Sequence, residues 1–453
     1  MLGGTHIAPG PAARPGRAPL IGLVVLGLAM LAFVATAPWL IRAHGYGLLV
    51  PCIVASGFLT LAATALAPGV APRIGLPLIL GLAIAMRLAL LAAEPLLSTD
   101  IYRYVWDGRV QAAGINPYLH VPADAALAGL RDAAIYPNIN RANYAVTAYP
   151  PVAHAFFFIV TRLSETVTGM RLGMLACEAV IVAIVIDLLR RLRLPVTAVV
   201  AWAWHPLAIW EIANNGHVEA LMVALMMGGV WLAACNRALA GAVAVALAAM
   251  VKPYALAVLP ALWRPWNWRM PLAVIVTVAL CYLPYAGVGS GALGYLKTGY
   301  LSEEGVTSGQ YFWAVWLLGR LIGPVPGLTV AYLLIALGVL AWLGVRAAWR
   351  PDPTPATIVG DAGVLLIAGL FFLSPNYPWY FLAVVPFLAL GGGAPAWAMT
   401  LAAPLLYRPY ISPDHDLAWK TLSILPFIVV VGWVLTARGR LFTRGQGASQ
   451  WTN

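Results

Sequence analysis

The sequence predicts an all-α integral membrane protein, because of its composition and the lengths of its apolar runs. Of the 453 residues, 62% are hydrophobic and only 9% are charged, whereas soluble domains are about half apolar. A helix needs about 20 apolar residues to cross a bilayer, and the chain offers many runs of that kind. The 18 Trp and 18 Tyr residues are typical of membrane interfaces. We therefore expect a polytopic helix bundle.

The apolar runs follow one another along the chain, and they predict about 12–14 transmembrane helices. The expected helices are 20–41, 47–70, 75–93, 170–189, 196–210, 217–235, 238–251, 254–263, 270–287, 328–345, 358–373, 377–390, 395–407 and 418–436. The first run is too long for a cleaved signal peptide, so we expect it to be retained. The short pair at 238–263 could be a hairpin that crosses only partly.

Basic residues predict the orientation of these helices, because Lys and Arg are enriched in cytoplasmic loops. The tail 1–19 carries two Arg residues and is expected inside. Three crossings then place 94–169 outside. The stretch 150–164 should lie as a helix along the outer surface, so that the later Arg residues fall inside. These are Arg190, Arg191, Arg193, Arg237, Arg264, Arg269, Arg346, Arg350, Arg438, Arg440 and Arg444.

The same rule predicts a second outer loop at 288–327, with a short interfacial helix of its own. Residues 20–436 are expected to form one transmembrane domain, and 437–453 a cytoplasmic tail. Arg408 breaks the pattern by falling outside, which makes it a candidate for a functional charge. The sequence shows no internal repeat, whereas a transporter with inverted repeats should show matched halves.

The net charge of +11 does not indicate a nucleic-acid partner, since the basic residues lie in short loops where they meet anionic lipid. The four Cys residues are far apart in apolar stretches, so neither a disulfide nor a metal site is expected. The triplet Asp414-His415-Asp416 has metal-ligand residue types, but a polar loop explains it better. We expect no cofactor and no metal.

The most informative segment directly follows the third helix. Residues 98–118 read STDIYRYVWDGRVQAAGINPY, and charge at a membrane edge tends to be kept for function. If 99–112 is helical, Asp100, Tyr104 and Asp107 share one face, and Arg103 could pair with Asp107. The alternative is an interfacial helix capped by Ser98 or Thr99, with Asp100 favourable only as a helix start.

Five segments together resemble bacterial GT-C glycosyltransferases that use a polyprenyl-phosphate sugar, most closely the polyprenol-phosphate-mannose-dependent mannosyltransferases. The segments are STDIYRYVWDGR at 98–109, GINPY at 114–118, YPP at 149–151, NGHVEALM at 215–222 and KPY at 252–254. The resemblance covers about 75–390, and the two helices before it look like an N-terminal addition. It implies a GT-C-type bundle whose first outer loop carries an essential Asp, a position that Asp100 matches.

The chemistry that the resemblance implies suits these residue types. A sugar phosphate expels a good leaving group once cations hold its charge, and an acceptor hydroxyl needs a carboxylate to take its proton. A single base opposite the leaving group gives inversion, as in inverting glycosidases. Asp100 is the expected base. The candidates for the donor phosphate are Arg103, Lys252 and Arg408.

Further polar residues are expected around the substrate, and for each of them a purely structural role is the alternative. Lys252 interrupts an apolar run, though it could snorkel to the interface. His217 and Glu219 open a helix, as ordinary capping residues also do. The expected substrate pocket comprises Tyr104, Asp107, His217, Glu219, Tyr254, Asn376 and Tyr380. Glu303 and Glu304 in the second outer loop are read as solvated side chains.

The expected activity is inverting transfer of a hexose, with mannose favoured, from a polyprenyl-phosphate donor to a lipid-linked or cell-envelope glycan. The expected partners are that donor, that acceptor and membrane lipids, with no nucleic acid. The expected location is the inner (plasma) membrane, with the active site on the periplasmic or extracellular face. The alternatives are a transporter or flippase of lipid-linked sugars, and a GT-C enzyme that uses arabinose, an aminosugar or a protein acceptor.

Overall fold

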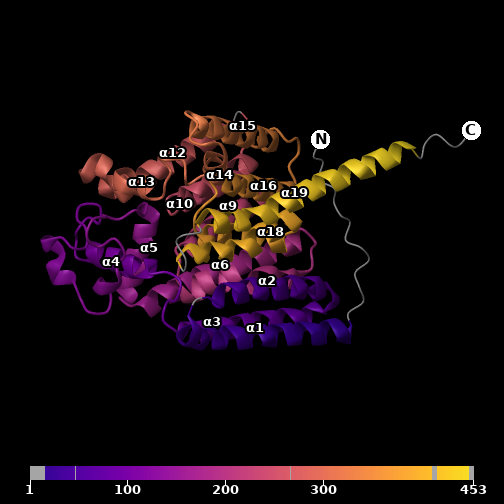
Figure 1. The fold of residues 1–453 in the computed structure, drawn as a ribbon, viewed down its shortest axis with the longest axis horizontal. Coiled ribbons are helices and arrows are strands. Elements are labelled where there is room, and N and C mark those ends of the chain that lie inside the picture. The colour runs from indigo at the N-terminus through magenta and orange to yellow at the C-terminus, as the bar shows by residue number, and fades with distance from the viewer. Residues whose placement is uncertain (1–15, 46, 266, 411–415, 448–453) are drawn as a thin grey trace, which may run out of the picture.

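The computed structural model describes residues 16–45, 47–265, 267–410 and 416–447. The described residues contain helices and no strand, which confirms the all-α class. Long helices lie roughly parallel in a bundle, and α4, α5 and α13 gather at one end of it (Figure 1). Helix α1 begins, and α19 ends, at the opposite end (Figure 1).

The helices fall in the predicted order. The first half contains α1 (Arg17–His44), α2 (Leu49–Leu66), η1 (Ala67–Gly69), α3 (Pro72–Leu91), α4 (Asp100–Ala112), η2 (Ala125–Leu130), η3 (Tyr136–Asn138), α5 (Pro151–Leu163), α6 (Val167–Arg191), η4 (Val196–Val199), α7 (Val200–Ala203), α8 (Pro206–Ala208), η5 (Ile209–Asn214) and α9 (Glu219–Ala234). The second half contains α10 (Ala238–Ala249), η6 (Pro253–Val258), α11 (Leu259–Leu262), α12 (Arg269–Tyr282), η7 (Leu283–Leu293), η8 (Leu296–Tyr300), α13 (Leu301–Glu303), α14 (Trp313–Ile322), α15 (Leu328–Ala348), α16 (Pro355–Leu373), η9 (Pro378–Val384), α17 (Val385–Ala389), α18 (Ala394–Ala402), η10 (Ala403–Tyr410) and α19 (Asp416–Gly447).

Fewer helices than expected are long enough to cross a bilayer. The described residues contain 8 such helices, or up to 9 if one bent pair counts as a single span, against the 12–14 expected. The difference lies in short helices such as α10, which has 12 residues. A helix of that length rises about 18 Å, whereas the hydrocarbon core is about 30 Å thick.

The bent pair shows how a predicted span breaks. The expected helix 196–210 is divided into Val196–Ala203 and Pro206–Asn214, which meet at 61°. Pro206 cannot donate the hydrogen bond that would continue the first helix. The side chain of His205 starts the second one, because its Nδ1 accepts the backbone N–H of Leu207 at 3.2 Å. The π-helix η5 forms the second part of the broken segment.

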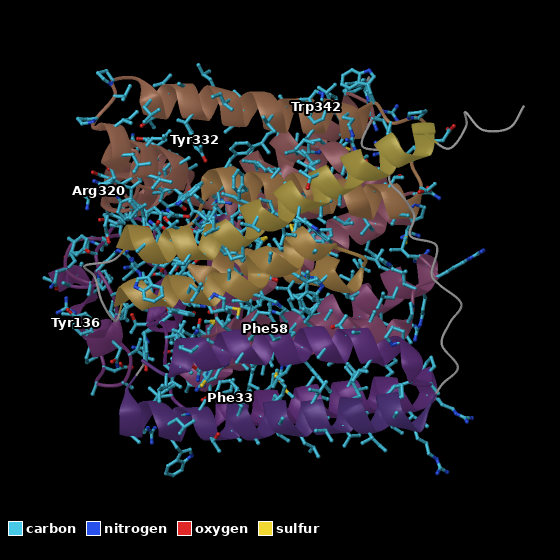
Figure 2. The ribbon with its side chains drawn as sticks, turned by 45° about the vertical axis from the view of Figure 1, so that its right-hand side comes forward. Phe33, Phe58, Tyr136, Arg320, Tyr332 and Trp342 are labelled. Carbon is cyan, nitrogen blue, oxygen red and sulfur yellow. The ribbon has the colours of Figure 1, made fainter. Side chains whose placement is uncertain are left out.

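The packing of α9 on α10 depends on small residues. A Cβ atom added at Gly229 would lie 2.7 Å from the carbonyl oxygen of Gly241, so the two helices approach backbone to backbone. Small residues permit such close approach between membrane helices. Elsewhere large apolar side chains face outward, as Trp342 of α15 does with 56% of its surface exposed (Figure 2). Such side chains suit a lipid-facing surface.

A buried ion pair joins α3 to α6. The guanidinium of Arg87 contacts the carboxylate of Glu178 through two hydrogen bonds of 2.6 and 3.2 Å. The same guanidinium donates to the carbonyl oxygen of Ala203 at 2.5 Å. Both side chains are buried, so each charge depends on the other for its stability.

We expect Arg87→Met to lower the stability of the protein strongly, because it leaves the Glu178 carboxylate buried without its cation. Breaking a buried pair in this way costs roughly 3–5 kcal/mol. The thermal unfolding midpoint in detergent should fall steeply for Arg87→Met and recover in Arg87→Met/Glu178→Leu. An equally low midpoint in the double variant would show that the pairing itself contributes little.

Candidate functional site

Asp100 is the first residue of helix α4 (Asp100–Ala112). An acidic residue in the first turn is stabilised by the helix dipole, and Ser98 Oγ accepts the backbone N–H of Asp100 at 3.2 Å. The helix expected over 99–112 is thus present. Asn140, from the loop 94–169 that also contains Asp100, donates its Nδ2 proton to Asp100 Oδ1 at 2.6 Å. This bond fixes the direction in which the carboxylate points.

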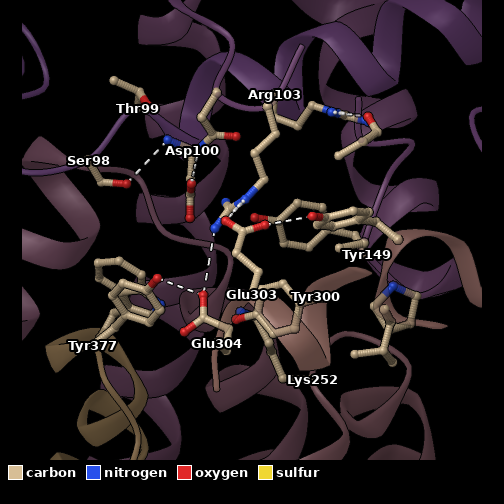
Figure 3. Close-up of a pocket in the computed structure, with 18 of the residues that line it drawn as sticks. Ser98, Thr99, Asp100, Arg103, Tyr149, Lys252, Tyr300, Glu303, Glu304 and Tyr377 are labelled. Carbon is tan, nitrogen blue, oxygen red and sulfur yellow. Dashed lines mark hydrogen bonds and ion pairs between the residues drawn. The ribbon is translucent and has the colours of Figure 1, made fainter. Parts of the chain in front are cut away.

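Asp100 lines a cavity of about 490 Å³ at the end of the bundle where α4 and α13 lie (Figure 3). The cavity is formed by the two predicted outer loops and by the turns before η6 and η9. Its polar and aromatic lining residues are Ser98, Thr99, Asp100, Arg103, Asn140, Arg141, Tyr144, Tyr149, Lys252, Tyr295, Tyr300, Glu303, Glu304, Tyr377, Trp379 and Tyr380. Of the eleven site residues predicted, four line this cavity: Asp100, Arg103, Lys252 and Tyr380.

Lys252 stands in the cavity wall between α10 and η6. Its Nζ lies 3.1 Å from Glu219 Oε1 and 5.0 Å from the ring centroid of Tyr380. Burial alone would lower the pKa of Lys252, but the Glu219 carboxylate, with smaller effects from Tyr380, Tyr149 and Asp100, raises it above the usual value. Lys252 therefore supplies a permanent positive charge to the cavity.

Arg103 and Asp107 form the i,i+4 pair that the sequence predicts, with Arg103 Nε 2.8 Å from Asp107 Oδ1. A second bond of 3.1 Å ties the guanidinium to the carbonyl oxygen of Ala145. Asp107 is only 1% exposed and does not line the cavity. Two helical turns separate it from Asp100, a rise of about 10 Å along α4, so a shared face does not bring both carboxylates to one substrate.

The other predicted pocket residues near α4 and α9 lie behind the cavity wall, and each contacts a residue that lines it. Tyr104 is buried, and its ring lies edge to face with Tyr149 at 5.1 Å between centroids. Glu219 is fully buried and reaches the cavity only through Lys252. Tyr254 packs against Tyr380 with ring centroids 5.3 Å apart. They support the wall and do not face the open volume.

His217 belongs to a buried cluster beneath the cavity. Its Nδ1 lies 2.9 Å from Glu211 Oε2, and its ring stacks on Trp379 at 4.2 Å. Tyr407 donates its hydroxyl proton to Glu211 at 2.7 Å. Burial alone would lower the pKa of His217, but its hydrogen bond to the Glu211 carboxylate, with the charges of Glu211, Glu219 and Asp100, raises that pKa. His217 was expected in the substrate pocket, but it does not line this cavity and instead supports the ring of Trp379, which does.

Asn376 and Arg408 complete the predicted set. Asn376 lies beside the cavity, where its Nδ2 donates to Glu304 Oε2 at 3.1 Å. Arg408 belongs to η10 (Ala403–Tyr410), and its side chain lies outside the described residues. Most of the triplet Asp414-His415-Asp416 also lies outside them. Among the residues that the structure describes, no three His, Cys, Asp or Glu side chains gather as metal ligands would.

Sequence reasoning missed the contacts between the two outer loops. Arg141 Nε lies 2.7 Å from Glu303 Oε1, and its Nη2 lies 3.6 Å from Glu304 Oε1. The backbone N–H of Tyr295 donates to the carbonyl oxygen of Thr147 at 2.9 Å. These bonds join the second loop to the first, and Figure 3 shows Glu303 and Glu304 among the side chains of the cavity. Glu303 and Glu304 therefore line the cavity, although their sequence context resembles a solvated loop.

The arrangement is suited to a reaction between an anionic and a neutral substrate. A carboxylate held by Asn140 faces an open volume, and the Lys252 ammonium lines the same volume. Tyrosine and tryptophan rings form much of the remaining wall. Such a site can bind a phosphate ester beside the cation and place a hydroxyl group against the carboxylate.

Comparison with known proteins gives two matches. A family model described as "Alpha-(1->6)-mannopyranosyltransferase, N-terminal domain" matches residues 21–267, so the likeness includes α1 and α2 and begins well before residue 75. The chain is 27% identical over 370 residues to Alpha-(1->6)-mannopyranosyltransferase A of Mycobacterium tuberculosis, a match that covers 70% of this chain and 63% of that protein. No solved structure matches the chain.

Proposed function

Because the chain belongs to the Alpha-(1->6)-mannopyranosyltransferase family, whose model matches more than half of it, we propose that this multi-pass membrane protein is a mannosyltransferase. The proposed donor is a polyprenyl-phosphate mannose, and the proposed acceptor is a lipid-linked or cell-envelope glycan. The chain spans 63% of the length of its mycobacterial relative, so the activity and both substrates are proposals.

The observation that carries the proposal is the placement of Asp100 and Lys252 on one cavity at the end of the helix bundle. A carboxylate alone could be a helix cap. A carboxylate and an ammonium that line one cavity instead match the two needs of sugar transfer from a phosphate. Arg103 is tied to Asp107 and to the carbonyl oxygen of Ala145. Lys252 has one carboxylate partner among the described residues, Glu219, and its ammonium has three N–H donors, so we assign the phosphate primarily to Lys252.

In the proposed reaction the acceptor oxygen attacks C1 of the mannosyl group. Its proton passes to the Asp100 carboxylate as the new C1–O bond forms. The bond between C1 and the phosphate oxygen breaks, its electron pair stays on that oxygen, and polyprenyl phosphate leaves with its charge held by Lys252. Attack opposite the leaving group inverts the configuration at C1.

The proposed location is the inner membrane, with the cavity open to the outer face. Helix α1 begins at the end of the bundle opposite α4 and α13 (Figure 1), the helices that contribute Asp100 and Glu303 to the cavity. The positive-inside rule places that beginning in the cytoplasm.

A donor competition tests the proposed function. Purified protein in lipid nanodiscs should transfer labelled mannose from polyprenyl-phosphate mannose to a membrane glycolipid extract. A nucleotide-activated mannose at the same concentration should give no product, because the cavity lies in a membrane bundle that would seat a lipid carrier. Transfer from the nucleotide sugar alone would refute the proposed donor. Binding of the lipid donor without transfer to any acceptor would favour the transporter alternative.

A further inference from the structure

Within this proposed function, the cavity divides into two chemically different halves. The wall formed by α4 and the turn before η6 carries Asp100 and Lys252, and we call it the first half. The other half is built by the second outer loop, which contributes Glu303 and Glu304. Figure 3 shows these two carboxylates facing the side of the cavity from which Asp100 projects. We propose that the second half is the acceptor subsite, and that it takes the end of a neutral glycan.

Fixed hydrogen-bond acceptors are the first reason. Glu303 receives a bond from Arg141 at 2.7 Å on one oxygen and from the Tyr295 hydroxyl at 2.6 Å on the other. Glu304 receives bonds from the Tyr377 hydroxyl at 2.7 Å and from Asn376 at 3.1 Å. Every oxygen is thus held in place, and each keeps a second lone pair for a ligand. Such a set recognises hydroxyl groups, which are donors.

The burial of Glu304 is the second reason. Its side chain is only 4% exposed, which is uncommon for a glutamate in a surface loop. The structure holds it through Asn376, whose Oδ1 accepts a bond of 2.6 Å from the buried Lys420 of α19. Residues from several elements of the fold therefore hold this one carboxylate at the cavity. A solvated loop glutamate would not need such support.

Charge gives the class of acceptor. Among the residues that line the second half, two carboxylates share one guanidinium, that of Arg141. The Lys420 ammonium lies behind Asn376 and does not line the cavity. The ammonium of Lys252 lies in the other half, paired with Glu219. A phosphorylated or carboxylated glycan end would meet like charge in the second half, whereas a neutral hexose would not. The same repulsion directs the phosphate of the donor towards Lys252.

Aromatic rings supply the remaining surface that a sugar needs. Tyr144 lines the cavity with 60% of its surface exposed. Deeper in the cavity, Tyr377 and Trp379 stack with ring centroids 4.5 Å apart. The C–H faces of a hexose pack on rings of this kind, whose apolar bodies can be buried while their polar groups bond.

A binding measurement tests this subsite without requiring turnover. Equilibrium dialysis would compare (1→6)-linked mannotriose with its 6-phosphate ester, on the intact protein in nanodiscs. We expect wild type to bind the neutral sugar more tightly. Glu304→Gln should weaken that binding about tenfold, because an amide oxygen is a poorer acceptor than a carboxylate, and should reduce the discrimination against the phosphate ester. Tyr144→Ala, an exposed change, should weaken binding with the fold intact.

The matched control is Glu165→Gln, an equally conservative change at a first-loop glutamate whose side chain is 42% exposed and lies outside the cavity. It should bind as wild type does. Three results would each overturn the acceptor subsite. Wild type could prefer the phosphate ester, or it could bind neither sugar. The third is a Glu304→Gln variant that binds the donor more weakly but mannotriose as before. Mannotriose binding without transfer from any donor would instead refute the proposed function and leave the glycan subsite standing.

Discussion

Asp100→Asn should lower the turnover number for mannosyl transfer by at least about 100-fold, the usual contribution of a general base. The amide keeps the size of the side chain and can still accept the bond from Asn140, but it cannot take the proton of the acceptor hydroxyl. Donor binding and the thermal unfolding midpoint should stay near those of wild type. Steady-state transfer and donor binding, measured on the same preparation, check both expectations.

Asp124→Asn is the matched control for this experiment. Asp124 lies in the same outer loop, outside the cavity, with 38% of its side chain exposed, and Asn is as good a cap as Asp. Its activity should equal that of wild type. Full activity in Asp100→Asn would reduce Asp100 to the start of a helix, and Glu304 would become the carboxylate to test.

Lys252→Met should have the second large effect, and it should act on both stability and transfer. The substitution leaves Glu219, which is fully buried, without its cation, at a cost of roughly 3–5 kcal/mol. It also removes the charge that holds the leaving phosphate. Loss of one such electrostatic contact typically lowers the turnover number about 100-fold. A single variant cannot separate these two losses.

The double variant Lys252→Met/Glu219→Gln separates them. Replacing both charges should restore most of the unfolding midpoint, since no unpaired carboxylate remains, while transfer stays about 100-fold below wild type. Lys252→Arg should keep the stability and part of the activity. If the double variant recovered both the midpoint and the turnover, Lys252 would be a structural partner of Glu219 and not a ligand of the phosphate.

The helices were predictable because apolar runs and polar breaks are local features of the chain. Helix α4 could be predicted from its own sequence, and so could the i,i+4 pair of Arg103 with Asp107. Long spans such as α6 were also placed closely. Fewer single helices among the described residues reach crossing length than the 12–14 expected, because apolar content does not reveal where a run such as 196–210 breaks.

The cavity was only half predictable, because its second half depends on contacts between distant residues. Arg141 meets Glu303 across 162 positions of sequence, and no local pattern distinguishes that glutamate from a solvated one. The hydrogen bond of Asn140 to Asp100 was not predicted for the same reason. Asp107 was expected beside the substrate from helical periodicity, which fixes direction around the axis but not distance along it.

A single-turnover experiment tests the central claim most directly. Wild-type protein in nanodiscs would be loaded with polyprenyl-phosphate mannose labelled in the sugar, freed of excess donor, and mixed with the membrane glycolipid extract. We predict that the label moves to the glycolipid with inverted configuration at C1, and that one polyprenyl phosphate is released for each mannosyl group transferred. Release of intact donor, with no label in any acceptor, would contradict the account and identify the cavity as a carrier site.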